Sequence, residues 1–372
     1  MDAQTQFCPN PNCHARGKVG EGNIVVHSEK EKHYRCKVCG ETFSATKGTP
    51  FYRLRTSADV VTLVMTLLAN GCPVQAIVTA FGFDERTVYR WLKACGVHCK
   101  KVHEHIVCQS QVELRHVQAD EIWVKMVLRR VFMAMAISVP SRLWLGGVIS
   151  VRRDMALISA LANMIRSCAY GLGILVCVDG LSSYVKAFKK AFRQRVLTGQ
   201  RGRPRLVLDQ GFMLGQVIKR YAKGRVVSVS RRVVIGTISL ISSFLRETMG
   251  GKMINIAFIE RLNSTFRSRL FALVRRSRAI LRREGMLTAW MYLVGCFYNF
   301  CCYHEGLRLR CDEGSSVKWY ERTPAMAAGL SEYRWTMMEL LWFKIPLSVW
   351  VAPKRRGRKP KMEKQPALEV VI

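Results

Sequence analysis

The chain has 372 residues, 49% of them hydrophobic, so it can bury a sizeable core in two or three domains and is not a disordered tail. Lys and Arg number 59 against 26 acidic residues, and the net charge of +33 is spread along the sequence. This charge indicates a polyanionic partner such as DNA, although a ribosome-like or membrane-surface protein would share it.

The sequence has no secretory signal and no apolar stretch long enough to span a bilayer. We therefore expect a soluble, cytoplasmic protein that has no membrane partner. Of its 14 cysteines, four form a tight pattern near the start and ten are scattered through apolar segments. Scattered cysteines of this kind are typical of reduced core thiols rather than of a disulfide framework.

Residues 1–53 carry the cysteine pattern. Cys8 and Cys13 lie in "CPNPNC", and after 22 intervening residues Cys36 and Cys39 follow in "CKVC". Four thiolates in two turn-like pairs can close a tetrahedral Zn²⁺ site, and so small a segment needs such a staple to fold. The spacing predicts a zinc-ribbon-like head, and a redox pair or unrelated cysteines are the alternative.

Residues 54–100 have the spacing of a helix-turn-helix DNA-binding domain. Two apolar helical patterns are separated by "NGCP". A third helix can be capped by Asp84 and face inward through Val88, Trp91 and Leu92. Its outward side chains suit phosphate and base-edge contacts in a major groove. These candidate DNA-binding residues are Arg86, Tyr89, Arg90 and Lys93. Three-helix hairpins without a DNA function share much of this pattern.

Residues 112–345 alternate between strands and helices. Three apolar strands with short turns, a helix from Met155 to Cys168 and a continuous apolar run ending at Asp179 predict a mixed α/β sheet. Asp120, on the first strand, should meet Asp179 near the carboxyl end of the fourth strand. Glu121 should not be the partner of Asp120, because side chains alternate along a strand and the two carboxylates should point to opposite faces. Asp209 also follows an apolar run and is a rival second acid.

A later amphipathic helix has its apolar positions at Ile259, Leu262 and Phe266. Glu260, with Asn263 and Arg267, lies on the adjacent polar stripe. Alone, Glu260 would be an ordinary ion-pair partner of the surrounding arginines. Together with two strand carboxylates it would complete a triad able to hold two Mg²⁺ (or Mn²⁺) ions about 3.5 to 4 Å apart for phosphodiester displacement.

The last segment, 346–372, combines Pro, Gly and clustered basic residues. Its composition predicts a disordered tail that either contacts the DNA backbone or keeps the protein soluble.

Several motifs follow one another in a specific order. "QADEIW", "VCVDGLSSY" and "NIAFIERLNSTFRSRL" precede "FYNFCCYHEGLR" and "RTPAMAAGL". With the cysteine head, the chain from Cys8 to Leu340 resembles the bacterial insertion-sequence DDE transposases that carry a zinc ribbon and a helix-turn-helix. The resemblance implies an RNase H-like catalytic core in which Asp120, Asp179 and Glu260 bind the metal ions. It also favours Asp179 over Asp209, and it places Asn263 and Arg267 at the DNA.

The resemblance further implies a reaction. Such an enzyme binds the terminal inverted repeats of its own element in double-stranded DNA, cleaves there and joins the freed 3′ ends to a target strand. Because two ends must be paired, we expect a homo-oligomer, at the nucleoid of a bacterial cell. Glu305 and Gly306 depart from the pattern of similar proteins. The alternatives are a DNA-binding regulator without chemistry, a decayed copy, and a structure-selective nuclease on the same core.

Overall fold

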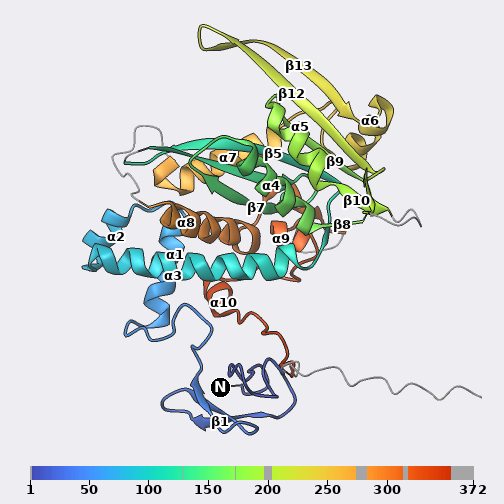
Figure 1. Cartoon of the computed structure of the whole chain (residues 1–372). Helices are drawn as coiled ribbons and strands as arrows, with labels where there is room; N and C mark the ends of the chain where they lie inside the picture. The colour runs from blue at the N-terminus through green and yellow to red at the C-terminus, as the bar shows by residue number, and fades with distance from the viewer. Residues whose placement is uncertain are drawn as a thin grey trace, which may run out of the picture. The chain divides into compact units, whose positions relative to one another are not determined.

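The computed structural model describes residues 2–127, 129–171, 173–196, 203–273, 283–312 and 317–352 (Figure 1). It divides into two compact units, one formed by residues 1–47 with 346–372 and the other by residues 48–345. Among the described residues, no helix is both long and apolar enough to cross a membrane.

The first unit contains a small antiparallel sheet. Its strands are β1 (Ile24–Ser28), β2 (His33–Cys36) and β3 (Thr42–Ser44), in the order β1-β2-β3. Tyr34 and Phe43 are buried, with ring centroids 5.9 Å apart, in a small hydrophobic cluster that also contains Ile24. So little apolar area cannot by itself offset the conformational entropy of folding, which makes the neighbouring cysteines structurally important.

Part of the predicted tail packs in this first unit. The His14 ring lies against the Trp350 ring, with centroids 4.0 Å apart. Gly17 has a φ of +71°, and a Cβ there would lie 2.4 Å from the Leu347 carbonyl oxygen, so only glycine allows this close approach. Leu347 and Trp350 therefore pack in this unit, whereas 353–372 lie outside the described residues.

The second unit begins with three helices, α1 (Ala58–Ala69), α2 (Val74–Phe81) and α3 (Glu85–His103). The Asp84 carboxylate caps α3 by accepting hydrogen bonds from the backbone N–H groups of Arg86 (2.9 Å) and Thr87 (3.2 Å). The predicted inward positions Val88, Trp91 and Leu92 are buried. The predicted helices and cap are thus present, and α3 is longer than its apolar pattern indicated.

A six-stranded mixed sheet forms the centre of this unit. The strand order is β13-β12-β9-β5-β6-β7. The strands are β5 (His116–Lys125), β6 (Arg130–Ser138), β7 (Trp144–Ser150), β9 (Ile174–Asp179), β12 (Phe212–Ala222) and β13 (Arg225–Ile235). Strands β5, β6 and β7 run antiparallel in sequence, while β9 is parallel to both β5 and β12. The mixed α/β fold predicted from the sequence is confirmed.

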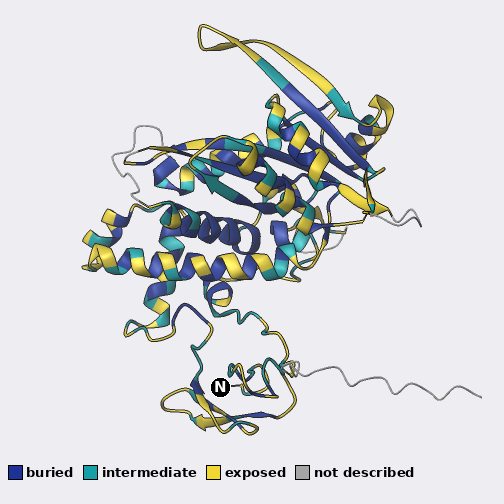
Figure 2. Ribbon diagram, viewed as in Figure 1, coloured by how far each residue is buried: buried dark blue, intermediate teal, exposed yellow. Residues whose placement is uncertain are grey.

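Helices cover both faces of the sheet. On one face lie α4 (Met155–Cys168) and α5 (Ser182–Ala191), and on the other lie α7 (Ala257–Arg269) and α8 (Glu284–Cys296). Because both faces are covered, the central strands are buried (Figure 2) and read as nearly continuous apolar runs.

The helices predicted as a separate domain share the core of the sheet. Helix α3 packs along α8 so closely that a Cβ on Gly96 would lie 2.1 Å from the Ala289 carbonyl oxygen. One continuous hydrophobic cluster runs from Phe51 through Trp91 to Leu341. The residues around position 100 therefore lie inside one packed unit, with α3 continuing across the expected boundary.

Shorter elements complete the described residues. The remaining strands are β4 (Val112–Glu113), β8 (Ala169–Tyr170), β10 (Arg193–Val196), β11 (Arg205–Leu208), β14 (Leu309–Arg310) and β15 (Trp319–Tyr320). The remaining α-helices are α6 (Ile238–Glu247), α9 (Pro324–Ala327) and α10 (Met337–Trp342). Short π-helical or 3₁₀ segments cover Glu104–Cys108, Phe271–Leu273, Phe297–Cys301 and Glu305–Leu307.

Candidate functional site

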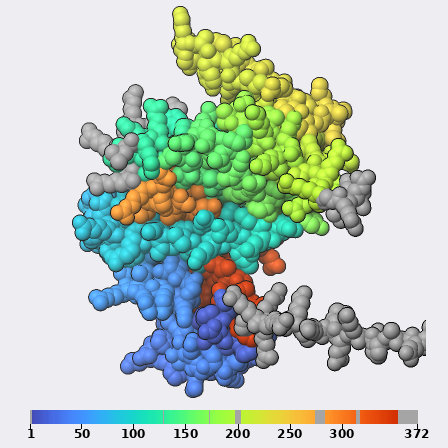
Figure 3. Space-filling view, in the orientation of Figure 1, coloured from blue at the N-terminus to red at the C-terminus, as the bar shows by residue number. Residues whose placement is uncertain are grey.

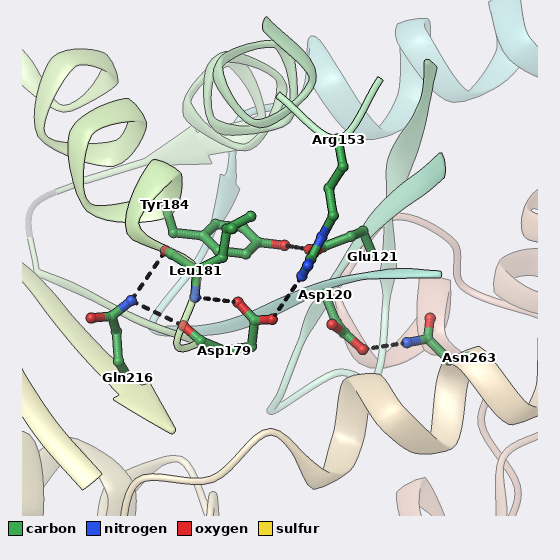
Figure 4. A network of polar contacts seen from close by, with 8 residues as sticks. All are labelled: Asp120, Glu121, Arg153, Asp179, Leu181, Tyr184, Gln216 and Asn263. Atoms are coloured by element: carbon green, nitrogen blue, oxygen red, sulfur yellow. Dashed lines mark hydrogen bonds and ion pairs between the residues drawn. The ribbon is translucent and has the colours of Figure 1, made fainter. Parts of the chain in front are cut away.

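Three carboxylates gather where two parallel strands of the sheet separate. The pairing of β5 with β9 ends at Gln118 and Cys177, so the residues that follow on each strand border a gap. Asp120 and Glu121 on β5, with Asp179 at the end of β9, place carboxylate oxygens within 4.8 Å of one another (Figure 4). The predicted meeting of Asp120 with Asp179 is confirmed, and the group can hold a metal ion.

The exclusion of Glu121 from this group was wrong. The two neighbouring side chains do leave β5 on opposite faces, since Asp120 meets α7 and Glu121 meets α5. However, β9 no longer pairs with β5 at this level, and the longer glutamate side chain reaches into the gap. Alternation along a strand decides the starting direction of a side chain but not where its end lies at an unpaired position.

The carboxylate of Glu121 is enclosed by protein atoms. Its side chain is 2% exposed, accepts a hydrogen bond from the Tyr184 hydroxyl and forms an ion pair with Arg153. The same guanidinium lies 3.1 Å from Asp179 Oδ2. Burial raises the pKa of Glu121, whereas the hydrogen bond from Tyr184 and the positive charge of Arg153 act in the opposite direction. The site therefore already favours cationic charge.

Asp120 has the most perturbed acidity in the group. Burial raises its pKa to about 7, and the negative charges of Glu121 and Asp179 add to the rise. Its Oδ2 accepts a hydrogen bond of 2.8 Å from Asn263 Nδ2. Among the described residues, the buried Asn263 Oδ1 has no hydrogen-bond partner. A divalent cation at Asp120 would lower the cost of burying this charge, which fits a metal site.

Glu260 faces the same cavity from α7. The cavity has a volume of about 380 Å³ and is lined by Asp120, Asp179, Lys219 and Glu260, among others. The Glu260 carboxylate forms an ion pair with Lys219 of β12, and this hydrogen bond raises the pKa of the lysine. Glu260 is therefore brought to the cavity, but it is not part of the group of three carboxylates within 4.8 Å.

Gln118 positions α7 and was missed by sequence reasoning. It is fully buried, and its Oε1 accepts hydrogen bonds from the N–H groups of Phe258 (2.9 Å) and Ile259 (3.1 Å) at the start of α7. Because it precedes Asp120 by two residues on the same strand face, one strand both caps α7 and presents an acid to it. A glutamine inside an apolar strand was the available signal.

Gln216 plays a similar part for Asp179. Its Nε2 donates to the carbonyl oxygens of Asp179 (3.0 Å) and Leu181 (3.3 Å). The Leu181 N–H in turn donates to Asp179 Oδ1 at 2.9 Å. These bonds hold the turn after β9, so the direction of the Asp179 carboxylate is fixed by two neighbouring segments of chain.

The prediction that Asn263 contacts DNA requires correction. Its side chain is only 2% exposed and is hydrogen-bonded to Asp120, because the inner face of α7 packs directly on β5. Arg267, one turn later, is half-buried and remains a candidate for a phosphate contact. The polar stripe on α7 is thus divided between a buried support for Asp120 and a partly exposed outer face.

The rival acid Asp209 lies at the other end of β9. Its carboxylate accepts hydrogen bonds from Gln194 and from the backbone N–H of Gly211. The Gly211 carbonyl oxygen accepts from the N–H of Ile174, the first residue of β9. Asp179 ends that strand, so Asp209 is remote from the carboxylate cavity and closes a turn instead.

A second candidate metal centre lies in the first unit. The sulfur atoms of Cys8, Cys13, Cys36 and Cys39 all lie within 4.8 Å of one another. Cys8 is 3.6 Å from Cys39, and Cys13 is 3.8 Å from Cys36, measured between sulfur atoms. A tetrahedral Zn²⁺ site with bonds of about 2.3 Å requires sulfur separations of about 3.8 Å. The four residues therefore fit a zinc ion, and all 14 cysteines are free of disulfides.

The predicted DNA-binding residues lie on the outer side of α3. Arg86, Arg90 and Lys93 are exposed, whereas Tyr89 is half-buried. Arg90 donates a hydrogen bond of 3.2 Å to the Thr87 hydroxyl. The helix thus presents a basic face of the kind that phosphate contacts require.

Comparison with known proteins adds no relative. No model of a known protein family matches the chain, and no curated protein matches it.

Proposed function

We propose that this protein is a DDE-type DNA transposase, a metal-dependent enzyme that cleaves the ends of its own element and joins them to target DNA. The observation that carries the proposal is the cavity that Asp120, Asp179 and Glu260 line in a chain of net charge +33. A polyanionic substrate would be attracted to such a chain, and clustered carboxylates are the ligands that Mg²⁺ prefers.

The sheet supports an RNase H-like core. A three-stranded antiparallel meander is followed by strands parallel to its first member, and the acids lie where β5 and β9 part. In mixed and parallel sheets, ligands bind at such points, outside the carboxyl ends of central strands. Two of these acids, Asp120 and Asp179, are ones that the resemblance in sequence implies, and the third that it implies, Glu260, lines the same cavity from α7.

The residues of the cavity can be given roles. Bound Mg²⁺ or Mn²⁺ would supply Lewis-acid activation of the attacking oxygen and stabilise the leaving oxygen. Asp120 and Asp179 would hold the ions, Glu260 would complete the set from α7, and Glu121 would orient the site through Tyr184 and Arg153. Lys219 would exchange its partner Glu260 for a substrate phosphate when the carboxylate turns to the metal.

DNA would be selected by the head and the first helices. The proposed zinc ribbon and the helix-turn-helix formed by α2 and α3 would bind the terminal inverted repeats through the basic outer face of α3. Asp84 fixes the start of α3, so Arg86, Arg90 and Lys93 occur on successive turns of a rigid helix. Phosphate contacts from these cations would set the register, and base contacts would supply specificity.

One observation favours a second candidate, a DNA-binding regulator without chemistry. Three of the four carboxylates already have internal cationic partners, because Arg153 pairs with both Glu121 and Asp179 and Lys219 pairs with Glu260. These ion pairs balance part of the negative charge of the cavity in the absence of a metal. The two candidates differ in one respect that can be measured, which is metal-dependent cleavage.

The test is a strand-transfer assay with the purified chain, Mg²⁺ or Mn²⁺, and DNA carrying the flanking ends of its own gene. We expect cleavage and joining that require metal and disappear in Glu260→Gln, while binding of those ends is retained. Cleavage without joining would point to a nuclease. Binding without any cleavage at any metal concentration would leave the regulator.

A further inference from the structure

Strands β12 and β13 continue beyond the sheet as a two-stranded arm. Strand β12 pairs with β9 only as far as Val217, and from there it pairs with β13 alone. Every residue from 220 to 232 is exposed, and the arm, defined here as residues 218–232, projects from the rest of its unit (Figures 1 and 3). An isolated two-stranded ribbon is at best marginally stable in water, so this surface is well placed to acquire a partner.

The tip of the arm is a tight hairpin turn. Lys223 and Gly224 have φ angles of +49° and +76°, and they connect Ala222 to its partner Arg225. Positive φ at both central residues is the signature of a type I′ turn, whose twist matches that of the flanking strands. The arm is therefore a defined structure rather than a loose loop, and it can present side chains in a fixed order.

The arm is basic throughout. It contains six cationic residues and no acidic residue. The three cations nearest the tip are exposed and form no ion pair among the described residues. The six are Lys219, Arg220, Lys223, Arg225, Arg231 and Arg232.

One face of the arm leads directly out of the carboxylate cavity. Lys219 and Tyr221 both line that cavity, and both lie on the same face of β12 because side chains alternate along a strand. Across the ribbon they pair with Val229 and Val226, so the face combines a cation with exposed apolar side chains. The Tyr221 side chain is 64% exposed, which leaves its ring free to stack.

The charge pattern identifies the occupant. Strand β13 is an edge of the sheet, so a second copy could in principle pair with it. Such a pairing would place basic strands side by side, and like charges opposite one another are destabilising. A polyanion that also carries flat rings satisfies both the cations and the Tyr221 ring.

We propose that the arm binds the DNA strand that continues from the carboxylate cavity. Its tip cations contact phosphates, and Tyr221 stacks on a base next to the position of the bond to be cleaved. This inference rests on the proposed function, since that function places a phosphodiester in the cavity. The arm would be a DNA-binding surface that is separate from the metal ligands and from α3.

The test measures DNA binding without catalysis. In EDTA, the dissociation constant is measured for a fluorescent duplex carrying the flanking ends of the gene with a short single-stranded extension, using the full chain. The arm variant changes Arg220, Lys223 and Arg225 to Gln. Its matched control changes Lys186, Lys189 and Lys190 to Gln, because these exposed cations of α5 remove the same charge elsewhere.

We expect the arm variant to bind DNA at least about tenfold more weakly than the control. The slope of log affinity against log salt concentration should be shallower by about two to three, since each lost phosphate contact removes about 0.9 from it. Tyr221→Ala should weaken binding about tenfold, since stacking on one base is worth ~1–3 kcal/mol, while Tyr221→Phe keeps the ring and the affinity. If the triple variant fails to fold, this conservative pair decides the matter.

The outcomes separate the arm from the proposed function. Arm variants that bind like the control overturn the inference, even if the wild type cleaves and joins DNA. Arm-dependent binding by a chain that never cleaves would support DNA binding by the arm but would overturn the transposase and, with it, the placement of Tyr221 beside a bond to be cleaved. Unchanged DNA affinity with a reduced molecular mass in light scattering would assign the arm to a second copy, which also overturns it.

Discussion

The chain has two candidate metal centres, and they differ in what stabilises the surrounding structure when no metal is bound. In the head, four thiols converge in a unit with little apolar core, and burial raises the pKa of Cys8 and Cys13 so that protons must leave when a metal binds. In the carboxylate cavity, Arg153 and Lys219 already balance part of the negative charge inside a large core. A metal should therefore determine folding in the first case and only activity in the second.

The largest expected effect is loss of the head when zinc is removed. Cys36→Ser or chelation should unfold residues 1–47, since a structural Zn²⁺ site contributes about 10–16 kcal/mol in zinc-finger peptides. Limited proteolysis and zinc quantification would measure it, with Cys311→Ser as control because that thiol lies outside the cluster. Preserved protection of the head in the zinc-free variant would contradict this expectation.

Next in size is the loss of chemistry from the acidic cavity. Asp120→Asn should reduce strand joining by a factor on the order of 10³, because it removes a ligand from the charge-stabilising metal site. The temperature at which the second unit unfolds should not fall, in contrast to the head, which should unfold when its metal is lost. Glu121→Gln and Glu260→Gln, compared by Mn²⁺ titration, sharpen the assignment of the third ligand. The ligand is the one whose loss weakens Mn²⁺ binding more.

The third prediction concerns pH. Protons and metal compete for Asp120, whose pKa in the metal-free protein is about 7. Affinity for Mn²⁺ should therefore rise about tenfold per pH unit below 7 and level off above it, as calorimetry can measure. A flat profile between pH 6 and 8 would show that Asp120 is not a ligand. The head should lose zinc at low pH by the same competition at its thiols.

The stability of the metal-free second unit should also depend on the titration of Asp120. It should fall as the pH rises, whereas the affinity for Mn²⁺ should rise. Because the folded pKa of Asp120 is raised above its unfolded value of about 4, its contribution is fully present below pH 4 and is lost as the pH rises through 7. Asp120→Asn should thus raise the stability at pH 8 in EDTA by an amount on the order of a few kcal/mol. Denaturant titration of variant and wild type at pH 4 and pH 8 would test this, and an equal difference at both would refute it.

The smallest effect is expected at Gln118. Replacing it with Ala removes the cap of α7 and should cost about 1–2 kcal/mol, with a modest loss of strand joining because Glu260 is displaced. Gln75→Ala, at an exposed position of α2, is the control. An effect of Gln118→Ala no larger than that of the control would show that α7 is held by packing alone.

Local features of this protein were determined by the sequence itself. The helix Met155–Cys168, the Asp84 cap and the strand that ends at Asp179 all agree with the structure, because capping and hydrophobic periodicity depend on neighbouring residues. The spacing of the four cysteines likewise predicted that their sulfur atoms lie together, since one short segment with two turns can close a tetrahedral site.

Only the tertiary structure decided the contacts between distant segments. The approach of Glu121 to Asp179 depends on where β5 and β9 stop pairing, and the Lys219–Glu260 ion pair depends on how α7 lies against β12. The shared core of α3 and α8 depends on a glycine that meets a residue almost 200 positions later. Such contacts follow from the way whole elements pack. The periodicity or capping of one segment does not specify which distant segment it will contact.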